Sequence, residues 1–359
     1  MKVAIIMGTR PEIIKLAPII NKLAKRDSFV VFTGQHYDYN LSLQFIEELS
    51  IRKPDYKLKL AESNPPLQIA EIIIKLSKIL YQTQPDTVVV QGDTNTVLAA
   101  SIASLKSGIP ISHVEAGPRS YDWRMPEEHN RIQVDHISEF LFAPSQHARK
   151  NLLSEHVHGK IFVTGNTIID AIQIYADKAS EKSNISIDAK DFILMTLHRA
   201  ENVDNKKTLS EIIKAVLDSK QNFIFPIHPR TYQRLHKFGL YNRLKNSKKI
   251  LLINPVGYFD MLELMKRCSF IVTDSGGIQE EATSPKIRKK VLVTRKATER
   301  PEAVSVGIAK VVGVKTNSIL SAIRKTVEEP KIFNKDTPYG KGDASEKIIR
   351  IMRRYFKHG

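Results

Sequence analysis

The fold is decided near the start of the chain by the stretch KVAIIMGTRPEIIKLAP, residues 2–18. Residues 2–7 are mostly apolar and rich in β-branched side chains, which predicts a buried strand. Gly8 begins a short turn, and after Pro11, which suits a helix start, apolar residues recur at helical spacing to residue 25. An apolar strand followed by an amphipathic helix is typical of a parallel sheet covered by helices.

The same alternation continues along the chain in two series, which a polar stretch at residues 178–190 separates. Strands are predicted at residues 2–7, 29–32, 87–90, 111–114, 140–143 and 161–164, and then at 192–197, 223–227, 250–253, 270–273, 291–294 and 310–312. Helices of the first series are predicted at residues 12–25, 41–49, 97–105, 127–137 and 146–153. This order predicts an α/β protein with two doubly wound units rather than one large sheet or an eight-fold barrel. The predicted domains are residues 1–177 and 178–340, and residues 341–359 contain one more helix at 344–356.

The composition is that of a folded, basic protein. Hydrophobic residues make up 42% of the 359 residues, and 55 Lys and Arg against 38 Asp and Glu give a net charge of +17. The charge favours an anionic partner, but aromatic residues are only 7% and no stacking motif accompanies the basic clusters, so no nucleic acid partner is expected.

The cellular setting is predicted from three further features. No apolar run reaches the ~18 residues of a membrane span, so no membrane partner is expected. The short apolar start is interpreted as a strand and not as a signal peptide. Cys268 is the only cysteine, which excludes an intramolecular disulfide and favours a reducing compartment. We therefore expect a cytoplasmic protein.

Three carboxylates follow predicted strands of the first series, where ligands of open parallel sheets bind. Asp93 in GDTN and Glu115 in HVEAGPRS come directly after strands, and Glu127 in MPEEHNR lies in the first turn of a helix. Arg10 lies in the GTRPE turn. Any one acid could merely cap a helix. Three together favour general acid and base chemistry, because neighbouring carboxylates can be driven to different protonation states.

The second series contains a candidate phosphate site in TDSGGIQEEA, residues 273–282. Ser275, Gly276 and Gly277 form a tight turn from a strand into a helix, where backbone N–H groups can face a phosphate. Glu281, one turn further, could accept hydrogen bonds from ribose hydroxyls. An ordinary glycine turn is the alternative. The turn lacks the G-x-G-x-x-G spacing, so no dinucleotide cofactor is expected.

Two histidines and an arginine follow other strands of the second series and should face the same rim. They are His198 in LHRAEN, His228 in IHPR and Arg300 in TERPE. The histidines lack the spacing of a zinc motif, so no metal is expected, and the absence of G-x-S-x-G disfavours serine hydrolase chemistry. The residues by themselves indicate a nucleotide-sugar or phosphate-ester enzyme without a cofactor.

In this order, the motifs closely resemble those of the non-hydrolysing UDP-N-acetylglucosamine 2-epimerases. The matching stretches are GTRPEIIKLAP, GQH, QGDTNTVLA, HVEAGPRS, MPEEHNR, TLHRAEN, HPR, TDSGGIQEEA and TERPE, which extend over nearly the whole chain. The resemblance implies a glycosyltransferase-B-like fold of two Rossmann-like domains facing across a cleft, a last helix that crosses back to the first domain, and a homodimer. It also implies reversible C2 epimerisation of UDP-GlcNAc to UDP-ManNAc without NAD, by anti-elimination of UDP to 2-acetamidoglucal and re-addition.

The resemblance further implies roles for individual residues. Asp93, Glu115 and Glu127 match the acid and base candidates, whose separate roles stay open. His198, also a catalytic candidate, and Arg10 match positions near the diphosphate. The other expected substrate contacts are Lys15 for the ligand, Ser275, Gly276 and Gly277 for the diphosphate, Glu281 for the ribose, Arg300 as an anchor, and Met261, where bacterial members commonly place an aromatic residue near the uracil.

The chain departs from the family pattern at several positions. Pro118 stands where leucine is usual, and the basic segment TSPKIRKK, residues 283–290, looks longer than usual, for which we expect a surface effect only. Gln35 and His36 match the activator-binding stretch of many bacterial members, but Asp38 replaces its later glutamine. Because a carboxylate near a diphosphate is unfavourable, we expect weak or absent activation by a second UDP-GlcNAc.

Three alternatives to this function stay open. The GQHYDYNLS segment, residues 34–42, also resembles relatives that epimerise UDP-2,3-diacetamido-2,3-dideoxyglucuronate. A hydrolysing epimerase would instead release ManNAc and UDP. The remote alternative is an RNA-binding protein, which the high positive charge would suit and in which the carboxylates would be dispensable.

Overall fold

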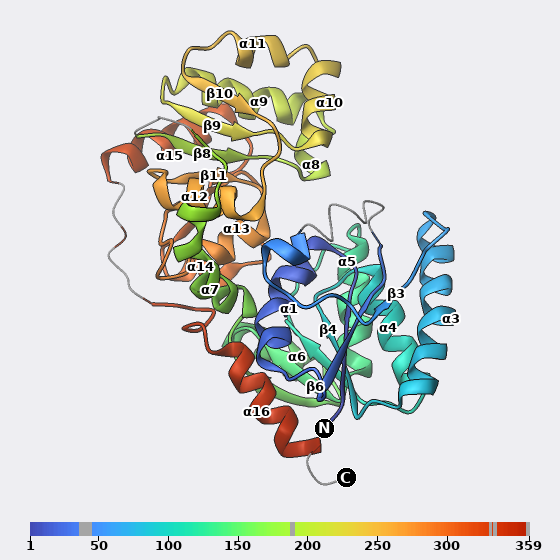
Figure 1. The fold of residues 1–359 in the computed structure, drawn as a ribbon. Coiled ribbons are helices and arrows are strands. Elements are labelled where there is room, and N and C mark those ends of the chain that lie inside the picture. Colours follow the sequence, from blue (N-terminus) through green and yellow to red (C-terminus); the bar gives the residue numbers. More distant parts are fainter. Residues whose placement is uncertain (36–44, 187–190, 330–331, 333–335, 357–359) are drawn as a thin grey trace. The chain divides into compact units, whose positions relative to one another are not determined.

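The computed structural model describes residues 1–35, 45–186, 191–329, 332 and 336–356. The chain folds into two compact units (Figure 1). Unit 1 consists of Met1–Ala171 with Tyr339–Gly359, and unit 2 consists of Ile172–Pro338. The division falls within helix α7 (Thr167–Lys182), so the first residues of the predicted polar linker are helical.

Unit 1 contains a parallel sheet of seven strands in the order β3-β2-β1-β4-β5-β6-β7. The strands are β1 (Val3–Met7), β2 (Ser28–Phe32), β3 (Tyr56–Lys57), β4 (Thr87–Gln91), β5 (Ile111–Val114), β6 (Phe140–Ala143) and β7 (Lys160–Val163). The helices are α1 (Arg10–Lys22), α3 (Pro65–Thr83), α4 (Asn95–Lys106), α5 (Pro126–Ile137), α6 (Gln146–Ser154) and α16 (Ala344–Phe356). Helices α1 and α16 pack together on one face of the sheet, and α3 and α4 pack together on the other (Figure 1). Burial on both faces explains why strands such as β1 are apolar throughout.

Unit 2 contains a parallel sheet of six strands in the order β10-β9-β8-β11-β12-β13. The strands are β8 (Ile193–Thr196), β9 (Phe223–Pro226), β10 (Ile250–Ile253), β11 (Ile271–Thr273), β12 (Val291–Val293) and β13 (Ala309–Val311). The helices after α7 are α8 (Ala200–Val203), α9 (Lys206–Asp218), α10 (Pro229–Lys237), α11 (Tyr241–Lys245), α12 (Tyr258–Arg267), α13 (Gly276–Glu281), α14 (Pro301–Ser305) and α15 (Thr316–Glu328). Its core is mainly aliphatic and includes the buried Phe223, Phe225 and Phe270.

The strand order reverses once in each sheet, between β1 and β4 in unit 1 and between β8 and β11 in unit 2. At such a switch point the loops after the two central strands diverge to opposite faces and leave room for a ligand. The GTRPE and GDTN turns follow β1 and β4, and the LHRAEN and TDSGG turns follow β8 and β11. The topology therefore places the predicted site residues where ligands of this architecture bind.

The last helix belongs to unit 1. Asp170 near the start of α7 accepts hydrogen bonds from the backbone N–H groups of Ala344 and Ser345, at 3.1 and 2.8 Å, and from the Ser345 hydroxyl at 2.5 Å. These bonds satisfy N–H groups that the first turn of α16 leaves without helical partners. Helix α16 then packs against α1 (Figure 1).

The predicted α/β class with two doubly wound parallel sheets is confirmed. The prediction missed β3 and α3, which occupy a region to which no element was assigned, and part of the predicted helix at residues 41–49 lies outside the described residues. Across the part of the chain that the structure describes, no helix is long and apolar enough to span a membrane.

Candidate functional site

Glu115, directly after β5, has a strained backbone and two polar partners. Its φ of +68° lies in the left-handed region, which is uncommon for residues with a side chain. Its carboxylate forms an ion pair with Lys15 of α1 and accepts a 2.9 Å hydrogen bond from Nε2 of Gln91. Both side chains of the ion pair are largely buried. Charge-assisted contacts of this kind stabilise the ionised carboxylate.

Asp93, after β4, is held by α5. Its carboxylate contacts two nitrogens of Arg131, one of them Nε at 3.1 Å, and Nη1 of Arg131 donates to Glu128 at 2.7 Å. Asn130 donates to the backbone carbonyl of Asp93 at 2.9 Å. The Asp93 side chain is still 30% exposed, whereas the Arg131 side chain is 7% exposed, so the carboxylate remains accessible while its cationic partner is buried.

The two adjacent glutamates at the start of α5 have different surroundings. Glu128 is fully buried and accepts hydrogen bonds from the backbone N–H groups of Ser120 and Tyr121, at 3.0 and 2.8 Å. Glu127, the predicted acid, is exposed. Glu128 therefore anchors the loop after β5 to α5, and Glu127 is the member of the pair that solvent or a ligand can reach.

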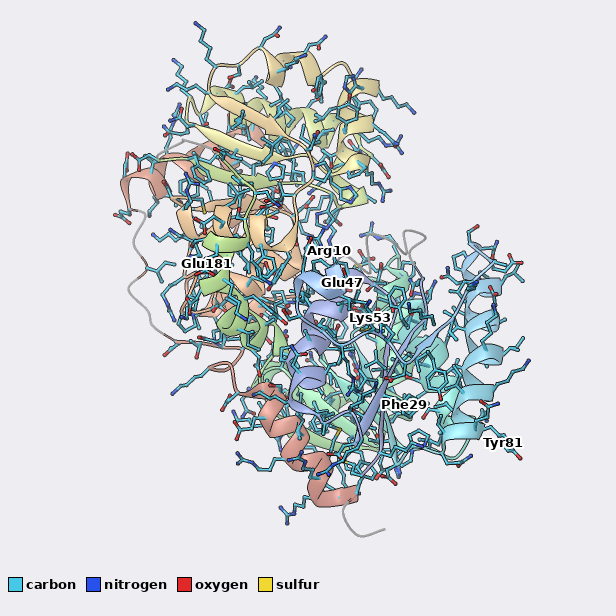
Figure 2. All side chains as sticks on the ribbon, viewed as in Figure 1. Arg10, Phe29, Glu47, Lys53, Tyr81 and Glu181 are labelled. Atoms are coloured by element: carbon cyan, nitrogen blue, oxygen red, sulfur yellow. The ribbon has the colours of Figure 1, made fainter. Side chains whose placement is uncertain are left out.

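The GTRPE turn is tied to the GDTN turn by a buried carboxylate. Glu12 accepts from the backbone N–H of Gly8 at 2.5 Å and from the hydroxyl of Thr94 at 2.6 Å. Burial raises the pKa of Glu12 to about 7, although these hydrogen bonds oppose the shift. Arg10, labelled in Figure 2, is exposed at the start of α1, and its guanidinium lies over the ring of Phe45 at 4.7 Å.

His198, after β8 in unit 2, is oriented by a buried aspartate. Its Nδ1 lies 3.3 Å from Oδ1 of Asp274, which follows β11 and also accepts from the backbone N–H groups of His198 and Arg199, each at 3.0 Å. The ring of His228 lies 5.7 Å from that of His198. Burial lowers the pKa of His198 even though Asp274 opposes the shift. The neutral ring is therefore favoured before an anion binds.

The predicted phosphate turn leads from β11 into α13, but its two glycines are the first residues of the helix and not a turn before it. Ser275 caps α13, because its hydroxyl accepts from the backbone N–H of Ile278 at 3.4 Å. A Cβ added to Gly277 would meet only the Ser275 hydroxyl at 3.9 Å, whereas one added to Gly276 would lie 3.0 Å from Oε1 of Glu299. Glu281 is half-buried at the end of α13. The turn therefore combines a helix start with an open face at Gly277.

Buried glutamates balance the arginines next to this turn. Arg300 contacts Glu280 at 2.5 Å, and Arg199 and Arg295 both contact Glu299. Burial alone would raise the pKa of Glu299, but the neighbouring arginines lower it to about 2. Glu299 is therefore ionised at neutral pH, and the ion pairs fix the guanidinium groups beside α13.

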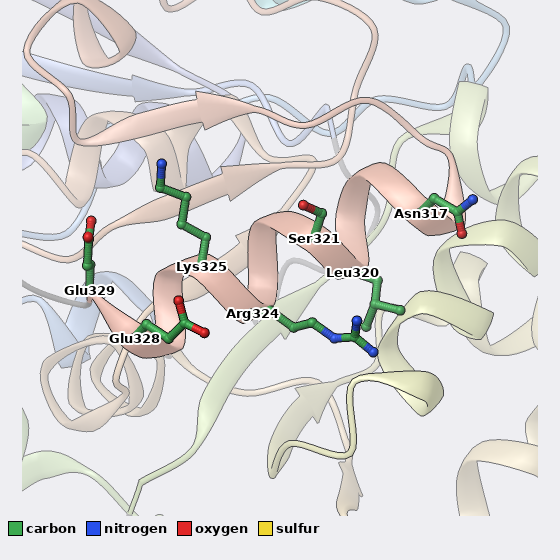
Figure 3. Close-up of a pocket in the computed structure, with 7 residues that line it drawn as sticks. All are labelled: Asn317, Leu320, Ser321, Arg324, Lys325, Glu328 and Glu329. Atoms are coloured by element: carbon green, nitrogen blue, oxygen red, sulfur yellow. The ribbon is translucent and has the colours of Figure 1, made fainter.

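The remaining predicted positions are less informative. Met261 is half-buried on α12, and Pro118 lies in the loop after β5. His36 and Asp38 lie outside the described residues. The hollow in Figure 3 is formed along α15 and contains none of the predicted site residues; its lining is Asn317, Leu320, Ser321, Arg324, Lys325, Glu328 and Glu329. Within the described ranges, no group of three or more His, Cys, Asp and Glu side chains is arranged to hold a metal ion.

The structure thus joins Lys15 to Glu115 within unit 1 and brings His198 to the loop of Ser275 within unit 2. It also shows partners that the sequence analysis missed: Gln91, Glu128 and Arg131 in unit 1, and Asp274, Arg199, Arg295 and Glu299 in unit 2. All of them lie inside or beside the quoted motifs. Most of these contacts join residues far apart in the chain, so the sequence carried no signal for them; only pairs close in sequence, such as Glu128 and Arg131 at i,i+3 spacing, could have been found.

Fold and site together define a two-domain α/β protein with charged side chains at the switch point of each sheet. A family model described as UDP-N-acetylglucosamine 2-epimerase matches residues 20–353. The UDP-N-acetylglucosamine 2-epimerase of Methanocaldococcus jannaschii is 44% identical, over 98% of this chain and 99% of the relative. The chain therefore belongs to the UDP-N-acetylglucosamine 2-epimerase family, a family of isomerases.

Two further comparisons bear on the fold and the substrate. The crystal structure of the Methanocaldococcus jannaschii enzyme in complex with UDP-GlcNAc and UDP has a TM-score of 0.89 with this chain, over 99% of this chain and 100% of that one, at 44% identity. A UDP-2,3-diacetamido-2,3-dideoxy-D-glucuronate 2-epimerase of Pseudomonas aeruginosa is 35% identical over 98% of this chain and 99% of the relative. The predicted family and the glycosyltransferase-B-like fold class are confirmed.

Proposed function

We propose that this protein interconverts UDP-GlcNAc and UDP-ManNAc by reversible C2 epimerisation. The observation that carries the proposal is the position of Asp93 and Glu115, at the carboxyl ends of the adjacent strands β4 and β5, each in contact with a cationic side chain. The 44% identical enzyme of Methanocaldococcus jannaschii, whose structure holds UDP-GlcNAc and UDP, supports the same substrate.

The reaction begins with the loss of UDP. A carboxylate removes the proton from C2 of the sugar, the electron pair forms the C1–C2 double bond, and the C1–O bond breaks so that UDP leaves with its electrons. The product is 2-acetamidoglucal. In the second step C2 takes a proton on the opposite face, and an oxygen of UDP attacks C1. Because the C2 proton is only weakly acidic, stabilisation of the leaving diphosphate must assist its removal.

The residues of unit 1 supply the acid and base in this proposal. Asp93, Glu115 and Glu127 are the candidates, and their individual roles are not separated. Lys15 and Arg131 contact the carboxylates of Glu115 and Asp93 and hold them in place.

The residues of unit 2 hold the nucleotide. The turn of Ser275, Gly276 and Gly277 offers the N–H groups of its two glycines to the diphosphate, since the N–H of Ser275 donates to the Thr273 hydroxyl at 2.9 Å. Arg300 is proposed as a further anchor, Glu281 as the ribose contact and Met261 as the residue near the base. The neutral ring of His198 would gain a proton when a diphosphate binds beside it, because a nearby negative charge favours the charged form. Arg10 and Lys15 complete the proposed ligand contacts from unit 1.

The test is an incubation of the purified protein with UDP-GlcNAc in D2O, followed by proton NMR. UDP-ManNAc with deuterium at C2 is the expected product. Free ManNAc and UDP would show a hydrolysing enzyme instead. Turnover of UDP-2,3-diacetamido-2,3-dideoxyglucuronate in a parallel assay, without turnover of UDP-GlcNAc, would assign the other sugar. Retention of hydrogen at C2 would contradict the proposed proton exchange.

A homodimer is also proposed, with α3 as its contact surface. Leu67, Ile74 and Tyr81 are 53%, 59% and 80% exposed and recur every seven residues, so they form one apolar stripe. Tyr81 is labelled at the far end of α3 in Figure 2. In an antiparallel two-fold pair of α3 helices, the stripe would pair with itself about Ile74. The mass in solution should fall from dimer to monomer in Ile74→Glu but not in Lys214→Glu, an exposed control on α9 of unit 2. A monomeric wild-type protein would refute the proposal.

We further propose that the protein works in the cytoplasm. Its single cysteine, Cys268, is buried and free, and burial raises the pKa of the thiol to about 12. Such a thiol is inert toward disulfide exchange and suits a reducing compartment. Fractionation of the source cells with an antibody against the protein tests this location.

A further inference from the structure

A buried charged network lies behind the two acid-bearing loops of unit 1. His113 of β5 is fully buried, and its Nδ1 lies 2.7 Å from Oδ1 of Asp135 on α5. Its Nε2 lies 2.8 Å from the backbone carbonyl of Gly92. On the other side of Asp135, Oδ2 contacts Nη2 of Arg119 at 2.8 Å, and Arg119 binds Glu155 through two nitrogens at 2.7 and 2.6 Å.

The partners of His113 decide how many hydrogens its ring carries. The Gly92 carbonyl can only accept a hydrogen bond, and an ionised Asp135 can also only accept. Burial alone would raise the pKa of Asp135, but the contacts with His113 and Arg119 lower it, so the carboxylate is ionised. A ring that satisfies both partners must therefore donate from both nitrogens. With a doubly protonated His113, the network balances two cations, His113 and Arg119, against two carboxylates. His136, whose Nε2 lies 3.7 Å from Glu155, is a further titratable group at its edge.

The network contacts both acid-bearing loops at their backbones. Gly92 directly precedes Asp93, so the bond from His113 to its carbonyl fixes the peptide from which that carboxylate extends. Oδ2 of Asp135 accepts from the N–H of Gly117 at 3.1 Å, two residues after Glu115. One histidine–aspartate pair therefore reaches both loops from behind.

The loop after β5 needs such support because its backbone is strained. Glu115 has a φ of +68°, and Gly117, with a φ of +92°, lies so close to α6 that an added Cβ would come within 2.4 Å of the Ala148 carbonyl oxygen. A non-glycine residue in the left-handed region is strained and persists only where its surroundings hold it. The hydrogen bond from Gly117 to Asp135 is one of the contacts that hold it.

We propose that His113, protonated on both ring nitrogens, and Asp135 are positioning residues that hold the loops of Asp93 and Glu115 in the geometry the reaction needs. The inference deepens the proposed epimerase function and rests on it. Neither residue touches the substrate. Their effect is therefore expected on turnover and not on the binding of the nucleotide, whose proposed contacts lie mainly on unit 2.

Two substitutions at position 113 separate the two contacts of the ring. Glutamine can place its amide nitrogen near the position of Nε2 and keep the bond to Gly92, whereas asparagine reaches only the position of Nδ1 and keeps the bond to Asp135. We expect His113→Asn to lower kcat by roughly 10- to 100-fold, since small displacements of acid groups cost that much, with KM and the Kd of UDP changed less than about threefold. His113→Gln should recover at least about a third of the kcat that His113→Asn loses. The exposed control His147→Gln should have the kcat of the wild type.

The outcomes that overturn the inference are distinct from a failure of the epimerase proposal. Unchanged kcat in His113→Asn, or equal losses in both variants accompanied by equal losses of thermal stability, would show that the network does not position the loops. Nitrogen-15 NMR of the histidine rings needs no activity and can be done on the wild type even if a variant does not fold. From the hydrogen-bond geometry we expect two protonated ring nitrogens on His113, with one proton lost in Asp135→Asn, and a singly protonated ring in the wild type would refute the network. Absence of epimerase turnover in the wild type would remove the proposed function and leave this spectrum unaffected.

Discussion

Replacement of Glu12 by glutamine tests the electrostatics of the GTRPE turn. Glu12 is fully buried in the first turn of α1, where its Oε2 accepts from the backbone N–H of Gly8 and its Oε1 contacts the hydroxyls of Thr9 and Thr94, at 3.0 and 2.6 Å. Because hydroxyls can accept as well as donate, a glutamine amide can replace all these contacts with its oxygen toward Gly8. The substitution therefore removes the titration of Glu12 and keeps the packing.

The magnitude follows from the raised pKa. Glu12 has a pKa of about 7 in the folded protein against 4.5 in the unfolded chain, so the folded state binds the proton more tightly. At 1.36 kcal/mol per unit, this contributes about 3 kcal/mol to the free energy of unfolding. That contribution is fully present below pH 4.5 and is lost as the pH rises to 7 and above. Relative to the wild type, Glu12→Gln should therefore gain about 3 kcal/mol between pH 4.5 and pH 8.

The measurement is urea unfolding of both proteins at several pH values across this window. The same substitution at the exposed Glu181, labelled in Figure 2, controls for the general effect of removing one carboxylate. Only the difference between variant and wild type is compared, because a two-domain protein need not unfold in one step. If the difference in free energy of unfolding between variant and wild type stays constant to within about 1 kcal/mol from pH 4.5 to pH 8, Glu12 is ionised throughout. The hydrogen bonds of Glu12 would then lower its pKa more than burial raises it.

Three further outcomes are expected. The kcat should fall by about a hundredfold or more in each of Asp93→Asn, Glu115→Gln and Glu127→Gln. The calorimetric Kd of UDP should change less than about threefold, because these acids act on the sugar ring. Unchanged turnover in all three variants would refute their assignment. Gly276→Ala should raise the Kd of UDP about tenfold, since its Cβ would lie 3.0 Å from Oε1 of Glu299 and 3.5 Å from Nη2 of Arg199, so that the start of α13 must shift. An unaltered Kd would contradict the cradle. Because Asp38 replaces a glutamine of the activator stretch, initial rates should be hyperbolic in UDP-GlcNAc and UDP-ManNAc should react alone, whereas sigmoidal rates would show that activation is retained.

The buried strands could be predicted from the sequence, but helix α3, which connects β3 to β4, could not. Both faces of the parallel sheet are covered, so a strand such as β4 is apolar almost throughout. Surface elements lack such continuous apolar runs, and the strand can therefore be recognised in the sequence. Helix α3 is different, because Ile72, Leu76 and Leu80 are buried while Ile74 and Tyr81 on the same helix are exposed. Apolar residues on several faces of the helix hide its amphipathic period.

The motifs located the site, but they did not reveal how its charges are paired. Strand order alone brings the residues after β1, β4 and β5 to one edge, so Asp93 and Glu115 could be chosen from their positions. Which of the two glutamates at the start of α5 would be buried depends on the rotation of the helix against the loop after β5, and that is a tertiary property. The same applies to Arg131, whose contact with Asp93 joins residues far apart in the sequence.

In both units a buried carboxylate links the loops after the central strands, but different residues supply it. In each, the loops after the central strands must stay close, and a buried carboxylate joins them: Glu12 links the loop after β1 to Thr94, and Asp274 links the loop after β11 to the backbone of His198 and Arg199. The acid comes from the first loop in unit 1 and from the second loop in unit 2. Equivalent topology therefore does not require an internal sequence repeat, because what recurs is a buried acceptor facing backbone and side-chain donors across the switch point.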